Sequence, residues 1–126
     1  MTTPRDFLVE AEDLLKGARS NEVRRRSVIS RAYYGGFHVA EAMARARGYR
    51  FDPDAGQGRH KHLWTFCTGA FPDNEAAREA VRDLARLHEQ RLRADYRLDR
   101  LVAFDDADDA VSRAREAVAI LSDAEV

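Results

Sequence analysis

An apolar stripe at helical spacing runs along residues 76–98 and constrains the fold of this chain more than any other feature. The stripe is formed by Ala77, Ala80, Val81, Leu84, Leu87 and Leu98. This spacing predicts an amphipathic helix that packs one face against other helices. His88, Arg91 and Asp95 continue the stripe, all within roughly 40° of its middle residue. A charged side chain on a core face is costly unless it is paired or lines a cavity, so these three residues require an explanation beyond helix formation.

Length and composition indicate one soluble domain. The 126 residues are enough for a single domain over 1–126 and too few for two. No apolar run approaches the roughly 20 residues of a membrane span, and the N-terminal segment lacks the pattern of a signal peptide. We therefore expect a cytoplasmic protein that does not enter the membrane. The net charge of −1 gives no overall attraction for nucleic acid.

The apolar pattern predicts helices along the whole chain. The expected helices cover residues 4–18, 21–47, 59–70, 74–98 and 105–123. Three of these helices begin at residues suited to capping. The first is preceded by Thr3 and starts with Pro4, the second can be capped by Ser20 or Asn21, and the fourth by Asn74. No stretch alternates with period two for long enough to predict a strand. The expected fold is all-α, an antiparallel bundle of four long helices plus one short helix.

The expected 21–47 helix is apolar on more than one side, which predicts a central position in the bundle. Gly35 and Gly36 lie inside it and cost about 1 kcal/mol each relative to alanine. Close approach of another helix is the usual compensation for such glycines. The opposite, polar face carries Arg31, Tyr34, His38, Glu41 and Arg45.

Charge is distributed unevenly along the chain. Arginines occupy positions 24–26 consecutively and are frequent over 86–100, whereas four aspartates occur within 105–109. The aspartates fall at the N-terminal end of the expected 105–123 helix, where the helix dipole favours negative charge.

The spacing of histidine and cysteine does not indicate a metal or cofactor. His60 and His62 would point about 200° apart on a helix, and no carboxylate stands nearby at a ligand spacing. The single cysteine, Cys67, falls on an apolar helical face and is interpreted as a small buried hydrophobic residue. We expect no metal and no cofactor.

Two interpretations of residues 88–96 follow from the residues themselves. In the structural interpretation, Arg91 and Asp95 form a buried ion pair that fixes the 74–98 helix against the 21–47 helix. In the functional interpretation, Arg91 binds phosphate, Asp95 orients it, and His88 or Tyr96 transfers protons. Both interpretations remain open at the level of the sequence.

Segments at three places share the spacing of a known family. They are SRAYYGGFHVAEAMARARG at 30–48, RHKHLWTFCTGAF at 59–71 and LHEQRLRADY at 87–96. Together they resemble the prokaryotic HEPN domain family, in particular a subgroup with R-A-Y-Y-x-x-F-H and R-x-x-x-D-Y motifs. The resemblance covers about residues 25–100. It implies a helical bundle that pairs into a homodimer. Many members are metal-independent endoribonucleases of toxin–antitoxin or phage-defence systems, encoded beside a nucleotidyltransferase partner.

The resemblance also implies roles for individual residues. Arg91 matches the catalytic arginine, which would lie in a composite cleft between two copies. Leu92 follows it where active members carry a polar residue, and the window for the signature histidine holds Tyr96, Arg97 and Leu98. His88 lies one turn before Arg91 on the same face and could supply the missing imidazole.

The expected site therefore has two parts. The residues expected to carry the chemistry are Arg91, Asp95, Tyr96 and His88. The residues expected to contact substrate are Tyr34, His38, Arg31 and His60. Three hypotheses follow: a ribonuclease with an altered site, a non-cleaving module that binds RNA, a nucleotide or a partner protein, and a structural bundle in which the Arg91–Asp95 pair only orders the core.

Overall fold

Five α-helices and a short 3₁₀ turn, η1, make up most of residues 1–124, which are the residues that the computed structural model describes. In chain order the elements are α1 (Pro4–Leu15), α2 (Glu22–Ala46), η1 (Pro53–Ala55), α3 (Arg59–Thr68), α4 (Glu75–Tyr96) and α5 (Phe104–Ala124). No strand occurs within this part of the chain. None of its helices combines the length and the apolar character needed to cross a bilayer. The fold is an all-α helical bundle, as the sequence predicts.

The helices begin where short polar side chains satisfy free backbone N–H groups. Asn21 accepts a hydrogen bond from the N–H of Arg24, and Asn74 accepts one from the N–H of Ala77, each at 3.0 Å. At α1 the N–H of Thr3 donates to the Asp6 carboxylate at 2.7 Å, and Pro4 occupies the first helical position. These caps match the predicted helix starts to within a residue or two.

The predicted end of the first helix is wrong. We expected a helix over 4–18, but α1 ends at Leu15 and spans 12 residues, so only α2, α4 and α5 exceed 20 residues. The N–H groups of Lys16, Gly17 and Ala18 bond to carbonyls three residues back, which closes a tight turn instead of another helical turn. Ala18 is fully buried after that turn. Its burial explains why the apolar pattern continues beyond the helix.

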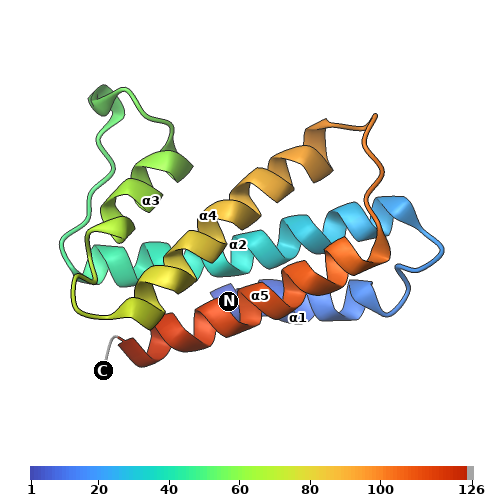
Figure 1. The fold of residues 1–126 in the computed structure, drawn as a ribbon, viewed down its shortest axis with the longest axis horizontal. Helices are drawn as coiled ribbons and strands as arrows, with labels where there is room; N and C mark the ends of the chain where they lie inside the picture. The colour runs from blue at the N-terminus through green and yellow to red at the C-terminus, as the bar shows by residue number, and fades with distance from the viewer. Residues whose placement is uncertain (125–126) are drawn as a thin grey trace.

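Helix α2 is the centre of the bundle and packs against each of the other four helices. Figure 1 shows α1 and α4 running in one direction and α2 and α5 in the other, with α3 near the C-terminal end of α2. Chain neighbours α1 and α2, and likewise α4 and α5, are therefore antiparallel. This arrangement confirms the central position predicted for the 21–47 helix.

Two glycines allow helices to approach α2 on different sides. A Cβ atom added at Gly35 would lie 2.7 Å from Cδ2 of Leu8 in α1, and one at Gly36 would overlap the Cδ2 atom of Leu84 in α4. The absence of side chains at these positions is what permits both contacts. The compensation expected for the two glycines is thus present.

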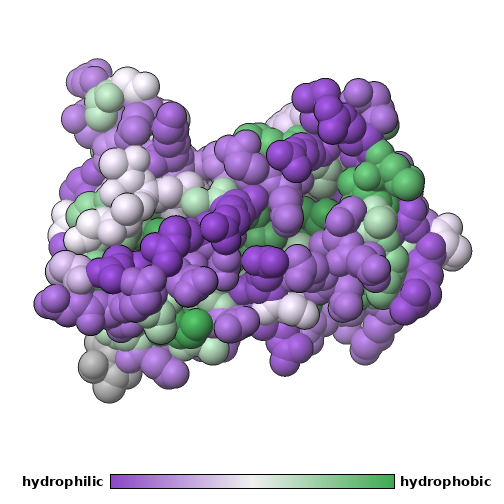
Figure 2. All heavy atoms as spheres, viewed as in Figure 1, coloured by the Kyte–Doolittle hydropathy of each residue, from purple (hydrophilic) through white to green (hydrophobic). Residues whose placement is uncertain are grey.

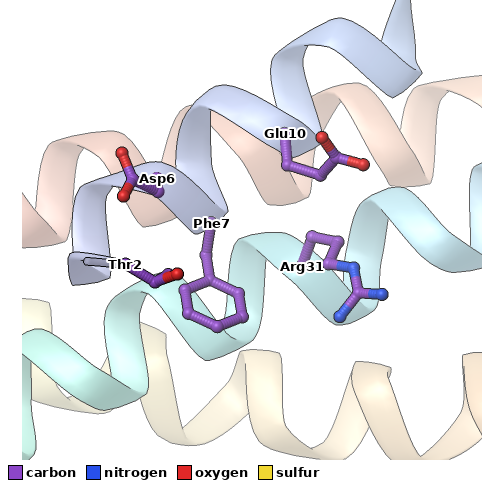
Figure 3. A pocket seen from close by; sticks show the side chains of 5 residues that line it. All are labelled: Thr2, Asp6, Phe7, Glu10 and Arg31. Atoms are coloured by element: carbon purple, nitrogen blue, oxygen red, sulfur yellow. The ribbon is translucent and has the colours of Figure 1, made fainter.

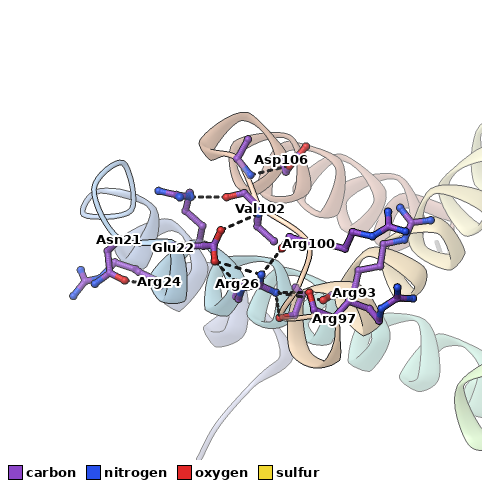
Figure 4. A network of polar contacts seen from close by, with 12 residues as sticks. Asn21, Glu22, Arg24, Arg26, Arg93, Arg97, Arg100, Val102 and Asp106 are labelled. Atoms are coloured by element: carbon purple, nitrogen blue, oxygen red, sulfur yellow. Dashed lines mark hydrogen bonds and ion pairs between the residues drawn. The ribbon is translucent and has the colours of Figure 1, made fainter.

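Arg26 fixes the C-terminal end of α4 to α2, as Figure 4 shows. Its guanidinium donates to backbone carbonyls of Arg93, Ala94, Arg97 and Arg100. Arg26 is only 7% exposed, and it also pairs with Glu22 at 3.4 Å. The neighbouring Arg25 donates from Nε to the carbonyl of Val102 at 2.7 Å. Two of the three consecutive arginines therefore hold the connection between α4 and α5 in place.

Candidate functional site

Arg91 lies where the C-terminal half of α4 meets α2. Its Nη2 donates to the hydroxyl of Tyr34 at 2.7 Å, and its Nε lies 3.0 Å from Oδ2 of Asp95. The hydroxyl of Ser30 donates to the same carboxylate oxygen at 3.4 Å. The Arg91–Asp95 ion pair therefore connects α4 to α2, the placement that the structural interpretation of the sequence requires.

The guanidinium of Arg91 still has unused hydrogen-bonding capacity. Within residues 1–124 it makes one hydrogen bond, to Tyr34, because its Nε–H is poorly aligned with Asp95 and has no acceptor. The guanidinium carbon lies 5.1 Å from the ring centre of Tyr34 and 5.6 Å from that of Tyr96. An arginine has five N–H donors in a planar fork, which suits a phosphate or carboxylate. The Arg91 side chain is 12% exposed, so its accessible edge is small.

Two imidazoles and a tyrosine stack beside this pair. The rings of His60 and His88 lie 4.9 Å apart and are nearly parallel, at 13°. The ring of Tyr33 lies 5.4 Å from that of His88, and its hydroxyl shares a 2.6 Å hydrogen bond with Nδ1 of His60. Helices α2, α3 and α4 each contribute one of these three side chains. Figure 2 shows the surface hollowed between α3 and the C-terminal end of α4.

Burial and nearby positive charge keep both imidazoles neutral at neutral pH. Burial lowers the pKa of His60 to about 4, with further lowering from His88 and Arg91. Burial also lowers the pKa of His88, and Arg91 lowers it further, while Glu89 acts in the opposite direction. A neutral imidazole can accept a proton but has none to give as an imidazolium. Burial raises the pKa of Tyr33, so its hydroxyl stays protonated.

The remaining predicted site residues lie farther from Arg91. The ring of His38 lies 6.1 Å from that of Tyr34 and 5.1 Å from that of Phe7 in α1. His38 is therefore one side chain removed from Arg91. Arg31 is exposed and lines an open cleft of about 240 Å³ against α1, shown in Figure 3. Two residues of the polar face of α2 therefore lie in different places: Tyr34 contacts Arg91, whereas Arg31 lies on the side of α1.

Sequence reasoning missed Ser30 and Tyr33 as members of the cluster. Tyr33 follows the apolar pattern of α2 and is fully buried, so the pattern alone describes it as a core residue. A buried tyrosine hydroxyl nevertheless needs a partner, and that requirement is the available signal. Nothing in the spacing of Ser30 indicates that it meets Asp95, which is far away in the sequence.

Metal ligands are not gathered in the described part of the chain. Within residues 1–124 no group of three or more histidine, cysteine, aspartate or glutamate side chains is placed to hold a metal ion. Nδ1 of His62 bonds to the hydroxyl of Tyr49 at 3.0 Å, on a different side of α3 from His60. Cys67 is fully buried, and burial raises the pKa of its thiol to about 12.

No family model, curated protein or solved structure matches this chain. The features that point to a function are therefore the Arg91 contacts, the two neutral imidazoles and the motifs of the sequence.

Proposed function

We propose that this chain is a HEPN-type protein that acts on RNA, with Arg91 binding a backbone phosphate and His88 accepting a proton. The observation that carries the proposal is a guanidinium with unused donors beside two stacked, neutral imidazoles. RNA offers phosphate for the guanidinium and a 2′-hydroxyl whose proton an imidazole can take.

The proposed reaction is an attack of the 2′-hydroxyl oxygen on the adjacent phosphorus. His88 takes the proton from the 2′-oxygen, the phosphorus–O5′ bond breaks with its electron pair going to O5′, and the protonated His88 returns the proton to the leaving 5′-oxygen. The products are a 2′,3′-cyclic phosphate and a 5′-hydroxyl. Negative charge builds up on the phosphate oxygens in the transition state, and Arg91 is the cation that stabilises it.

A bound phosphate would also change the protonation of the site. Arg91 lowers the pKa of both His60 and His88 in the free protein. A phosphate on Arg91 offsets that positive charge and raises the pKa of both imidazoles toward the ordinary value of about 6.5. His88 then holds the proton that the leaving oxygen needs.

A non-cleaving module is the second candidate, and the lack of an imidazolium to serve as proton donor in the free protein favours it. Without an imidazolium, and with Leu92 and Tyr96 at the family's signature positions, the site would bind RNA or a nucleotide without cutting it. In either case we propose a homodimer that belongs to a toxin–antitoxin or defence module, with a nucleotidyltransferase as its partner. Light scattering on the purified protein tests the dimer.

RNA cleavage in EDTA by the purified protein tests the function. The variants are Arg91→Ala, Arg91→Lys and His88→Ala, with Arg86→Ala as the control because Arg86 is an exposed arginine of the same helix. Loss of Arg91 should slow cleavage by about 10²–10³-fold, and loss of His88 by about 10²-fold. Arg86→Ala should cleave like the parent protein.

Binding and melting experiments on the same variants separate the remaining outcomes. RNA binding without cleavage, lost in Arg91→Ala but kept in Arg86→Ala, identifies the non-cleaving module. Neither binding nor cleavage by any sample, together with a large loss of melting temperature in Arg91→Ala, would leave only the structural role of the ion pair.

A further inference from the structure

A second candidate site lies where α4 leads into α5. A cleft of about 210 Å³ opens there, lined in part by Gln90, Arg93, Arg100, Leu101, Val102 and Asp106. None of these side chains belongs to the Arg91 cluster. The backbone of the cleft is held in place by Arg26, whose guanidinium donates to the carbonyls of Arg93 and Arg100, as Figure 4 shows.

The polar groups of the cleft are not satisfied by the chain itself. Arg93 and Arg100 are exposed, and within residues 1–124 neither has a carboxylate at ion-pair distance. Asp106 is already engaged, since it accepts a hydrogen bond from the N–H of Ala103 at 2.9 Å. Oε1 of Gln90 is buried and has no donor among the described residues. The cleft thus offers to a ligand two cations that are unpaired among the described residues.

Apolar side chains are exposed along the α4–α5 junction that carries the cleft, and one of them, Leu101, lines it. Leu98 is 73% exposed and Leu101 is 77% exposed, and Tyr96 of the same α4–α5 junction is 68% exposed. These three are half of the large hydrophobic side chains that are exposed in residues 1–124. Figure 2 shows apolar surface at this end of the molecule. Exposed aliphatic side chains grouped with tyrosine and arginine are typical of a surface that binds another protein.

We propose that this cleft docks an acidic segment of a partner protein. An aliphatic side chain of that segment fills the space beside Leu101 and Val102, and its carboxylates pair with Arg93 and Arg100. RNA would use the two arginines but would leave the exposed leucines without an apolar partner. The exposed aspartates at the start of α5 repel an acidic segment, so its carboxylates lie on the α4 side.

A short fluorescent peptide of alternating glutamate and leucine is the probe. We expect saturable binding to the full chain, with backbone amide NMR shifts concentrated at Gln90, Leu101 and Val102. Arg93→Glu and Arg100→Glu should each weaken binding by about tenfold or more. Arg50→Glu is the matched control, because Arg50 is exposed in the loop before η1 and has no ion pair within residues 1–124. It should bind like the parent protein.

Several results would overturn this assignment. One is equal binding of the same peptide with lysine in place of glutamate, and another is the absence of saturable binding. Loss of RNA binding in Arg93→Glu without any peptide binding would assign the cleft to RNA. A dimer that Leu101→Ser abolishes, with no peptide binding, would assign it to a second copy of the chain. Arg91→Ala should leave peptide affinity unchanged, so the two proposals succeed or fail separately.

Discussion

Tyr34 is the residue of α2 that determines where the Arg91 guanidinium lies. Tyr34→Phe keeps the ring and removes the only acceptor that Arg91 uses within residues 1–124. We expect a loss of about 1–2 kcal/mol in stability and about a tenfold loss in RNA affinity or cleavage. Chemical denaturation and RNA titration measure the two effects. Tyr49→Phe is the control, since it removes a similar hydroxyl, which is bonded to His62. It should lower stability without changing RNA affinity or cleavage.

His60 gives the free protein a dependence of stability on acidity. Its pKa is about 4 in the folded protein and about 6.5 when unfolded, so the unfolded chain binds the proton first as the pH falls. Stability is therefore complete above about pH 6.5, decreases between about pH 6.5 and 4, and levels off below. We expect a loss of about 1–2 kcal/mol after solvent screening is allowed for.

Denaturant melts at a series of pH values check this prediction. His60→Gln should reduce the slope of stability against pH in this interval, because the substituted amide does not titrate. A slope identical to that of the parent protein would mean that other groups cause the loss at low pH.

Individual side chains set the limit of what the sequence could predict about the site. The helical spacing of His88, Arg91 and Asp95 correctly placed them on one inward face of α4. It could not show that His60 stacks on His88 or that Tyr34 meets Arg91, because those contacts depend on how three helices pack. The sequence could not show the role of Arg26 either, since the carbonyls to which it donates lie at the C-terminal end of α4, far away in the sequence.

At the scale of helices, Gly36 controls the contact between α2 and α4. Gly36→Ala gains about 1 kcal/mol of helix propensity but forces a methyl group against Leu84, which is fully buried. Overpacking costs about 1–3 kcal/mol, so we expect a net loss of up to about 2 kcal/mol. Gly69→Ala should change stability by less than about 0.5 kcal/mol, because its φ of −92° suits any residue and an added Cβ there comes no closer than 3.9 Å to a neighbouring atom. Thermal melts that rank the two variants the other way would contradict the close-packing argument.

Arg26 is expected to be the most sensitive arginine for the stability of the α4 end. Arg26→Met removes the donors to the carbonyls after α4 and leaves Glu22 without its cation. Breaking such a buried network should destabilise the protein by about 3 kcal/mol. Arg24→Met, an exposed neighbour in the same run, should cost less than about 0.5 kcal/mol. Equal effects of the two substitutions, measured by urea unfolding, would mean that the hydrogen bonds from Arg26 to the end of α4 do not stabilise the protein.

Helix identity was predictable because caps and apolar periodicity are local properties of the chain. Asn21, Asn74 and Pro4 mark helix starts that the structure shares. The end of α1 was not predictable, because the apolar pattern continues to Ala18, beyond the last helical residue. Tertiary packing buries Ala18 although the backbone has already left the helix. Local patterns therefore predicted which segments are helical better than where each helix ends.

For the whole molecule, the net charge of −1 means that the proposed RNA binding depends on local cations. If Arg91 neutralises one phosphate, Arg91→Ala should weaken binding to all RNA sequences alike. It should also reduce the slope of log affinity against log salt by about 0.7 for single-stranded RNA. Arg115→Ala is the control, because Arg115 lies on α5 and pairs with Glu12 at 3.2 Å. It should leave the slope unchanged.

The salt dependence separates phosphate binding from a structural role more directly than affinity does. A variant that merely loosens the packing of α4 on α2 lowers affinity but still neutralises the same number of phosphates, so its salt slope stays that of the parent protein. Tyr34→Phe provides this comparison, since it disturbs the position of Arg91 while keeping its charge. A reduced slope in Arg91→Ala alone identifies Arg91 as a phosphate ligand. An unchanged slope would assign the Arg91–Asp95 pair to the bundle core.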